Sequence, residues 1–290
     1  MTGRAPGCII RAMRYGLTMP NFGSYAEVRA LASLAADAEA AGWDGFFLWD
    51  HISPAAPGGP APFADPWMAL TAVALSTERL RIGTMVTPIP RRRPWVLARQ
   101  IATLDRISDG RVTLGVGIGY PPEEYTFFGE DADERLRADK LDEGLEVVRG
   151  ILSGEPFRFE GEHYTVDEGA FLPASVQTPV PIWVAGMWPN RRPMRRAARW
   201  DGAFPIRADL QPLSPDDVRE IIAYVRKHRT SPQPFDAILS GESHGDSPFA
   251  LKHPLSEYEA AGVTWWLETL TDWAGTLEEM RGYVRGGPPR

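Results

Sequence analysis

Short apolar runs alternate along the chain with longer segments in which apolar residues recur at helical spacing. The runs have the length of buried strands and are closed by glycine, proline or polar residues. They predict strands at residues 13–19, 45–51, 79–87, 111–117, 181–185, 201–206, 235–240 and 263–268. The segments between and after them predict helices at residues 25–41, 67–76, 94–107, 133–152, 194–199, 215–229, 256–261 and 277–284.

Eight strands that are each followed by a helix are typical of a parallel (β/α)8 barrel. We therefore expect an α/β fold, a single TIM-barrel domain over residues 13–286, with a small hairpin insertion at 157–166 after the fourth helix. Residues 1–12 are interpreted as a disordered leader and residues 287–290 as a tail.

A doubly wound open sheet is the alternative fold, and it would carry a G-x-G-x-x-G fingerprint. The run Gly115-Val116-Gly117-Ile118-Gly119 places its third glycine one residue too early. Pro121 and Pro122 also follow where a phosphate-binding helix would begin. This pattern favours the barrel.

Composition narrows the class of partner. Lysine and arginine total 31 against 38 acidic residues, a net charge of −7, and nucleic-acid binding selects the opposite sign. No apolar run approaches the roughly 18 residues of a membrane span, and none at the start resembles a signal peptide. Cys8 is the single cysteine, so an internal disulfide is excluded. We expect a cytoplasmic protein that contacts neither nucleic acid nor membrane.

The strand predicted at residues 45–51 ends abruptly at Asp50 and His51. In a barrel the site is built at the carboxyl ends of the strands, so these two side chains are candidates for it. An imidazole can give or take a proton near neutral pH. We interpret His51 as functional, and Asp50 either as its companion in catalysis or as a cap of the strand.

The remaining motifs point to an organic cofactor. We find neither an H-x-H metal pair nor a G-x-S-x-G nucleophile elbow, and we expect no metal. After the fifth strand, Ala185, Gly186 and Met187 could bring backbone amides close to a phosphate. The basic run 91–93 either meets an acidic ligand or is solvated.

Five segments, in order, resemble the bacterial luciferase-like monooxygenase superfamily from Met13 to about Gly286. They are GLTMPNFG, AGWDGFFLWDH, TERLRIGTMVTPIPRRRPWVLARQIATLDRISDGRVTLGVGIG, PIWVAGMWPNRRPMRRAARWDG and AGVTWWLETL. The resemblance implies the same barrel. It also implies a redox cofactor, either the deazaflavin coenzyme F-420, used for hydride transfer, or reduced flavin mononucleotide (FMN), used with oxygen.

The resemblance assigns roles to individual residues. Asp50 and His51 would end the second strand near the redox ring, and a non-prolyl cis peptide at Met85–Val86 would back that ring. The cofactor contacts implied in this way are Thr84, Met85, Val86, Thr87, Gly117, Gly119, Tyr120, Ala185, Gly186 and Met187.

Two departures from the family pattern limit the assignment. Some deazaflavin dehydrogenases place a carboxylate directly after the fourth-strand glycines, where this chain has Tyr120 and Pro121, with Glu123 and Glu124 only later. This difference argues against a sugar-phosphate dehydrogenase. The fifth strand has Ala185–Gly186 in place of a Gly-Gly turn.

We therefore expect an F-420-dependent oxidoreductase that moves a hydride to or from a small organic substrate. His51 would position or protonate at the ring, and Trp49, Trp67 and Tyr120 would line an apolar substrate pocket. One alternative is an FMN-dependent monooxygenase, which would use a flavin reductase as partner. Another is a non-catalytic flavin-binding protein. A homodimer is expected from the resemblance.

Overall fold

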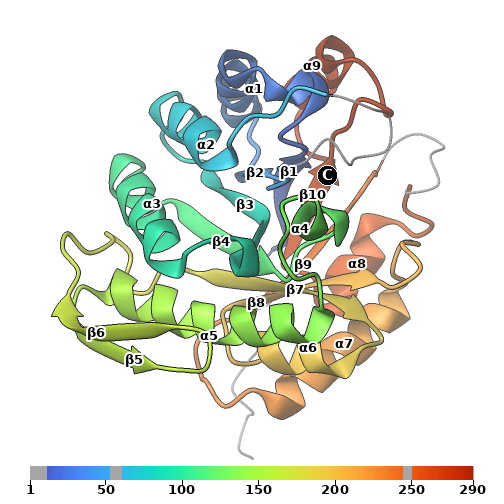
Figure 1. Ribbon diagram of the computed structural model, residues 1–290. Helices are drawn as coiled ribbons and strands as arrows, with labels where there is room; N and C mark the ends of the chain where they lie inside the picture. Colours follow the sequence, from blue (N-terminus) through green and yellow to red (C-terminus); the bar gives the residue numbers. More distant parts are fainter. Residues whose placement is uncertain (1–11, 53–60, 244–249, 290) are drawn as a thin grey trace, which may run out of the picture.

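The computed structural model describes residues 12–52, 61–243 and 250–289. Most of the expected leader, Cys8, His244 and much of the proline-rich loop after His51 lie outside these residues. Within them, eight parallel strands close into a barrel in the order β1-β2-β3-β4-β7-β8-β9-β10 (Figure 1). The strands are β1 Arg14–Met19, β2 Gly45–Leu48, β3 Arg81–Pro88, β4 Val112–Gly117, β7 Ile182–Trp188, β8 Gly202–Arg207, β9 Asp236–Gly241 and β10 Trp265–Thr269.

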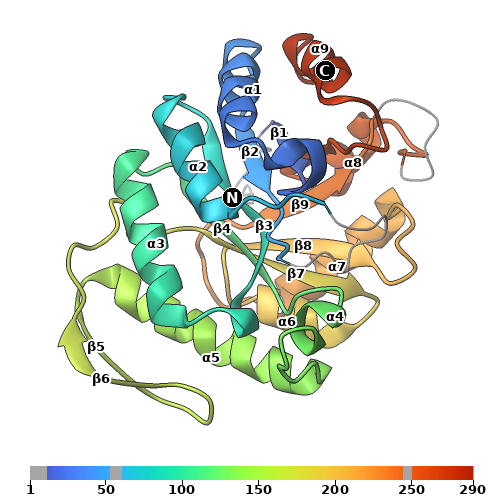
Figure 2. The same cartoon turned by 45° about the horizontal axis from the view of Figure 1, so that its top comes forward.

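Helices surround the barrel and alternate with its strands, which confirms the predicted (β/α)8 fold (Figure 2). They are α1 Val28–Ala40, α2 Pro66–Leu75, α3 Pro94–Ile107, α5 Glu134–Ser153, α6 Arg191–Ala197, α7 Pro215–His228, α8 Leu255–Ala261 and α9 Leu277–Arg285. Three short elements, η1 Gly23–Ala26, η2 Ile89–Arg91 and α4 Glu123–Thr126, follow β1, β3 and β4. Outside the barrel, β5 Pro156–Glu160 and β6 Thr165–Ala170 pair antiparallel.

The sequence signals that begin the helices are local. Asp65 caps α2 by accepting a hydrogen bond from the Met68 amide at 2.9 Å, with proline at the first helical position. Ser214 and Asp217 form a reciprocal capping box at the start of α7. These caps satisfy amide groups that the first turn of a helix leaves without partners.

Two apolar clusters stabilise the barrel. The larger one fills the layer between strands and helices, and the smaller one fills the barrel itself. The buried members of the inner cluster are Phe47, Met85, Trp183, Phe204, Ile238, Trp265 and Leu267. Glycines give these rings room: a methyl group added at Gly45 would lie 2.7 Å from the ring of Phe47 and 3.0 Å from that of Trp265. The barrel is therefore a packed core and not a pore.

The inner cluster is covered at one end and open at the other. At the amino ends of the strands, Arg14 lies 4.3 Å from the Trp265 ring centre and pairs with Asp236. Toward the carboxyl ends of the strands, Val86, Ala185 and Ile206 pack on the cluster but are only half-buried. We call this open end the barrel mouth.

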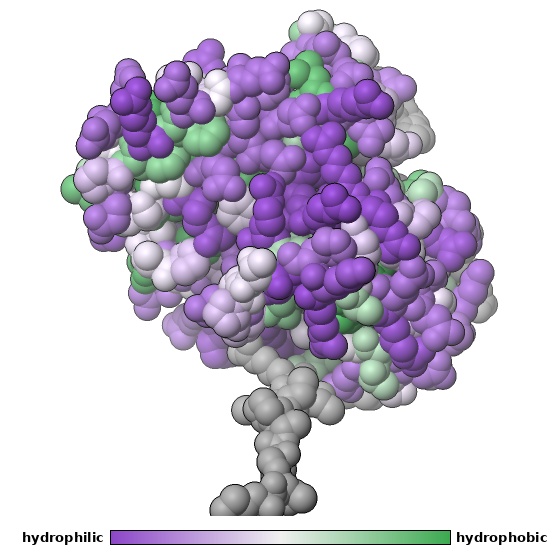
Figure 3. Space-filling view, turned by 90° about the horizontal axis from the view of Figure 1, so that it is seen from below, coloured by the Kyte–Doolittle hydropathy of each residue, from purple (hydrophilic) through white to green (hydrophobic). Residues whose placement is uncertain are grey.

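The outer surface is mostly polar where Figure 3 shows it, with apolar side chains in small patches. Among the described helices, none combines the length and the apolar character that a membrane crossing requires.

Replacing Gly45 by alanine tests the ring-on-glycine packing of the inner cluster. Because the added methyl group would overlap the rings of Phe47 and Trp265, we expect a loss of about 1–3 kcal/mol of unfolding free energy. The matched control is Gly169→Ala, which meets nothing within 4 Å. Urea unfolding followed by circular dichroism measures both. Equal midpoints for the two variants would show that this packing is unimportant.

Candidate active site

The end of β2 carries the polar residues of the site. Trp49, Asp50 and His51 follow directly after Leu48, where the chain leaves the barrel. Asn21, after β1, holds this segment: its side-chain amide donates to the His51 carbonyl at 2.8 Å and accepts from the His51 amide at 3.0 Å. Asn21 is fully buried, so the backbone of His51 is fixed from one side.

Asp50 is buried and its carboxylate is fully engaged. It accepts two hydrogen bonds from the guanidinium of Arg92, at 3.0 and 2.7 Å, and one from the Thr87 hydroxyl at 2.8 Å. Arg91 reaches the same carboxylate at 3.2 Å. Such contacts, with 1% of the side chain exposed, are those of an anchor between β2 and the segment after β3.

His51 pairs with a carboxylate from a different part of the barrel. Its Nδ1 lies 3.0 Å from Oε1 of Glu124, and the same oxygen accepts from the Ile52 amide at 3.0 Å. The other oxygen of Glu124 forms an ion pair with Arg91. The Glu124 side chain is 3% exposed and that of His51 27%. The histidine therefore has one nitrogen fixed in the interior and a side chain that solvent still reaches.

The electrostatics of Glu124 follow from this position. Burial by itself raises the pKa of a carboxyl group, but here the hydrogen bond and charge of His51, the charge of Arg91 and the Ile52 amide outweigh it. The pKa of Glu124 therefore lies below its ordinary value, and the carboxylate is ionised at neutral pH.

Sequence reasoning missed Glu124 as a partner of His51. It noted Glu123 and Glu124 only as a departure from the family pattern, because it expected no structured element between the fourth strand and residue 133. The structure forms the single turn α4 there, near the centre of the barrel view in Figure 1. The signal was Pro122 before Glu123–Glu124–Tyr125, since proline readily starts a helical turn, and Tyr125 is buried with its hydroxyl on the Ile118 carbonyl.

The predicted bulge lies within β3, at residues 84–87. The Met85–Val86 peptide is cis, which confirms the expectation from the resemblance, and the register between β3 and β4 shifts between Thr84 and Thr87. Both threonines are fully buried: the Thr87 hydroxyl donates to Asp50 and lies 2.9 Å from that of Thr84. Of this run, Val86 is the residue that is half-buried on the inner cluster.

The fourth-strand residues lie at the same end. Gly117 ends β4, and a methyl group there would come within 3.0 Å of the Val86 side chain. Gly119 has a positive φ of 86°, and an added methyl would lie 2.6 Å from the Tyr125 hydroxyl. Tyr120 is 62% exposed.

The fifth barrel strand extends further than its pattern predicted. β7 continues through Gly186 and Met187 to Trp188, paired with β8, so these residues form strand and not a turn. A side chain at Gly186 would collide with Pro193 of α6. Close approach of α6 to β7 thus gives this glycine a structural purpose that is independent of a ligand.

The two tryptophans predicted to line the substrate pocket lie in different parts of the structure. Trp49 lies beside His51, with ring centres 5.9 Å apart. Trp67, at the start of α2, is 2% exposed and packs in the larger cluster. The basic run 91–93 also divides, because Arg91 and Arg92 are directed inward to Asp50 and Glu124 while Arg93 is exposed.

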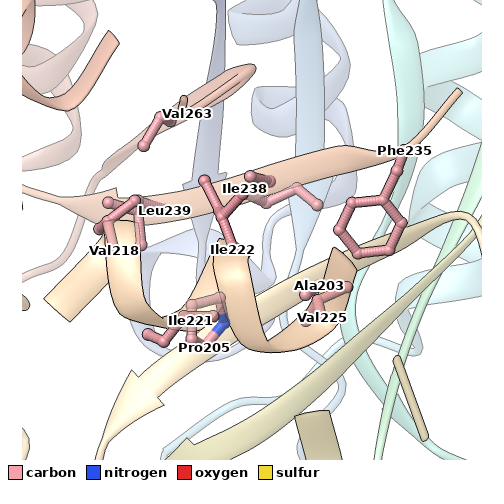
Figure 4. A pocket seen from close by; sticks show the side chains of 11 residues that line it. Ala203, Pro205, Val218, Ile221, Ile222, Val225, Phe235, Ile238, Leu239 and Val263 are labelled. Carbon is pink, nitrogen blue, oxygen red and sulfur yellow. The ribbon is translucent and has the colours of Figure 1, made fainter. Parts of the chain in front are cut away.

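Two cavities lie away from the His51–Glu124 pair. The first, about 10 Å³, is enclosed by apolar side chains of α7, β8 and β9 (Figure 4), and it is a packing defect of the core. The second, about 280 Å³, lies past the ends of β7 and β8 beside Trp188, Arg207 and Asp217. Among the described residues, no cluster of histidine, cysteine, aspartate or glutamate could hold a metal ion.

Comparison with known proteins identifies the family of this chain. The family model described as luciferase-like monooxygenase matches residues 13–244. An uncharacterized protein of Mycobacterium tuberculosis is 34% identical over 211 residues, which cover 68% of this chain and 70% of that protein. An F-420-dependent glucose-6-phosphate dehydrogenase of Gordonia bronchialis is 37% identical over 165 residues, 56% of this chain and 48% of that enzyme.

Solved structures show the same fold. One is an F-420-dependent secondary alcohol dehydrogenase in complex with an F-420–acetone adduct. The match covers 96% of this chain and 98% of that enzyme, with a TM-score of 0.76 and 19% identity. The oxygenating constituent of 3,6-diketocamphane monooxygenase from Pseudomonas putida, in complex with FMN, has a TM-score of 0.63 at 23% identity over 80% of this chain and 67% of its own. The extent of the family match decides the assignment: the chain belongs to the luciferase-like monooxygenase family of oxidoreductases.

Proposed function

We propose that this protein is an F-420-dependent oxidoreductase that transfers a hydride to or from a small organic substrate at the barrel mouth. The observation that carries the proposal is the hydrogen bond between His51 Nδ1 and the buried Glu124 carboxylate, 3.0 Å long. Its support from the comparisons is that relatives at 36–38% identity are named F-420-dependent glucose-6-phosphate dehydrogenases. The substrate of those relatives is not carried over.

The mouth fits a planar redox ring. Val86, Ala185 and Ile206 form a half-buried apolar surface on the inner cluster, against which one face of a ring can pack. Gly117 keeps the space beside Val86 free, because an added methyl group there would come within 3.0 Å of the Val86 side chain. Gly119, Tyr120, Gly186 and Met187 are retained as proposed contacts at the rim. The proposed role of the buried residues beside Val86, which are Thr84, Met85 and Thr87, is to hold Val86 in place.

His51 is proposed to move the proton. When bound, the deazaflavin supplies the hydride acceptor or donor. An ionised Glu124 accepts a hydrogen bond from the Nδ1–H of His51, which leaves Nε2 of a neutral His51 as the basic nitrogen. Nε2 can therefore take a proton from the substrate in one direction and return it in the other.

Asp50 and its arginines are proposed to position this pair. Arg92 and Thr87 fix Asp50, and Arg91 bridges Asp50 and Glu124. In this proposal Asp50 is a positioning residue and does not touch the substrate. Trp49, whose ring is next to His51, is the proposed wall of the substrate pocket.

FMN is the second candidate cofactor. The FMN-bound monooxygenase among the solved structures has the same barrel, which favours keeping this alternative. An FMN-dependent enzyme would need a flavin reductase as partner.

A homodimer is part of the proposal as well: the neighbouring helices α2 and α3 expose apolar side chains at Met68, Leu75, Val96 and Ile107.

Titration of the purified protein with F-420 and with FMN, each followed by fluorescence, tests the cofactor. We expect saturable binding of F-420 and much weaker binding of FMN. Tight binding of FMN alone would overturn the first choice in favour of the second.

Replacing His51 by alanine separates an enzyme from a non-catalytic binding protein. Loss of a general acid–base is expected to lower turnover by about 10²–10⁴-fold, while F-420 still binds with an unchanged dissociation constant. Turnover that persists in this variant would remove His51 from the proton path.

Replacing Glu124 by glutamine tests the buried pair through stability. Because the pKa of Glu124 is held below its ordinary value of 4.5, its contribution is present at neutral pH and is lost as pH falls through that depressed pKa. We expect the variant to be less stable at pH 7 by about 3 kcal/mol, and the gap to narrow below pH 4.5. The exposed Glu160→Gln is the control for urea unfolding at both pH values. A gap independent of pH would contradict the ionised pair.

A further inference from the structure

Four aromatic side chains gather beside His51. The ring centres of Phe22 and Trp49 lie 5.7 and 5.9 Å from that of the imidazole. Phe63 continues the group at 5.3 Å from Phe22, and Trp273 continues it at 6.5 Å from Trp49. We call Phe22, Trp49, Phe63 and Trp273 the aromatic cluster. The imidazole is therefore in contact with two aromatic rings, and each of these contacts one more.

The Phe22 side of the cluster is held by backbone hydrogen bonds. Phe22 and Phe63 form an antiparallel bridge between the segment after β1 and the segment before α2. The Ala64 amide donates to the Asn21 carbonyl at 2.8 Å, and the Asn21 side chain donates to the Ala64 carbonyl at 2.7 Å. These two rings thus have fixed positions relative to the end of β2, which Asn21 also holds.

The Trp273 side is held by a carboxylate. Asp272, after β10, accepts a hydrogen bond from the Ser24 amide at 3.0 Å and another from the Ser24 hydroxyl. The segment that carries Trp273 is thereby tied to the segment that carries Phe22. Since β10, β1 and β2 are consecutive in the barrel, the cluster occupies one continuous side of the mouth.

The rings of the cluster are accessible. All but three of the ten tryptophans are buried, and the exceptions are Trp49, Trp95 and Trp273. Two of these three are neighbours in the cluster. Trp273 is 63% exposed, and the other three rings of the cluster are half-buried. Adjoining aromatic surface that stays open to solvent is typical of a ligand-binding site, because leaving it in water is unfavourable.

The cluster and the surface proposed for the cofactor lie on different strands. Val86, Ala185 and Ile206 belong to β3, β7 and β8. The cluster follows β10, β1 and β2, and β2 is the neighbour of β3. His51, after β2, therefore stands at the border between the two. A molecule bound on the cluster can reach the imidazole while the cofactor occupies the other surface.

The chemistry of the rings indicates what they bind. Flat aromatic ligands interact favourably with the faces and edges of such rings, beyond the gain from buried area alone. Quaternary ammonium ions are the other ligands that aromatic groups select. His51 becomes positively charged when it takes up a proton in the proposed reaction, and this charge opposes a cation in the cluster. A neutral aromatic ring fits both conditions.

We propose that the aromatic cluster binds the substrate through an aromatic ring, and that Trp49 and Trp273 select ring-bearing substrates over saturated ones of the same size. This inference rests on the proposed oxidoreductase function, because it assigns the cluster to the substrate of that reaction. Trp49 holds the ring of the substrate next to His51. Trp273 adds contact on the solvent side, where its own side chain is exposed.

NMR titration with 2-naphthamide and with its saturated counterpart, decahydro-2-naphthamide, tests the inference. Each probe is added to the protein alone and to the protein saturated with F-420. We expect 2-naphthamide to bind about tenfold more tightly than the saturated probe, and Trp273→Ala to weaken its binding about fivefold. Trp273→Phe, which keeps a ring, should restore most of this loss.

Trp95→Ala is the matched control, because Trp95 is a partly exposed tryptophan that contacts Tyr164 and no ring of the cluster. It should leave the dissociation constant of 2-naphthamide unchanged. Circular dichroism confirms that each variant is folded, and the exposure of Trp273 favours this outcome.

The outcomes separate the two proposals. If F-420 does not bind, the proposed function fails, while the titration of the protein alone still decides whether the cluster recognises aromatic rings. Equal binding of the two probes, binding of neither, or an unchanged dissociation constant in Trp273→Ala overturns the aromatic selection. Displacement of F-420 by 2-naphthamide would assign the cluster to the cofactor and contradict its role toward the substrate.

Discussion

Two buried carboxylates that share one arginine, Arg91, hold the barrel mouth together. Asp50 at the end of β2 and Glu124 of α4 are both bound by Arg91, and Arg92 completes the coordination of Asp50. Isolated charges cannot be buried without a large penalty, so each member requires the others. Three segments far apart in the sequence are thereby fixed to one another, and the orientation of His51 follows from their positions.

Below this network, the barrel core supplies the second half of the site. The aromatic rings of the inner cluster occupy space left by glycines such as Gly45. Because this core is packed to its upper rim, the mouth has a firm apolar surface at Val86, Ala185 and Ile206. The proposed function assigns proton chemistry to His51 and the ring to this surface, and such a site requires that cofactor and proton donor be held in a fixed relation.

The fold was predictable because its elements repeat a strong local pattern: the helix predicted at 94–107 is α3 itself, Pro94–Ile107. The details of the site depended on contacts that no local pattern contains. Glu124 lies 73 residues from His51, on a turn too short for helical periodicity to reveal. Gly186 was interpreted as a phosphate turn although helix packing already requires it, and Trp67 was assigned to a pocket although it is buried. A residue type marks a possible role, but burial and partners decide it.

The tautomer of His51 is the property on which the proposed chemistry depends most directly. Two-bond proton–nitrogen NMR of the ¹⁵N-labelled protein near pH 8, with the His51→Ala variant used for assignment, observes it. Glu124 predicts a protonated Nδ1 and a bare Nε2, and loss of that preference in Glu124→Gln. A proton found on Nε2 in the unaltered protein would contradict the pairing and the proton path built on it.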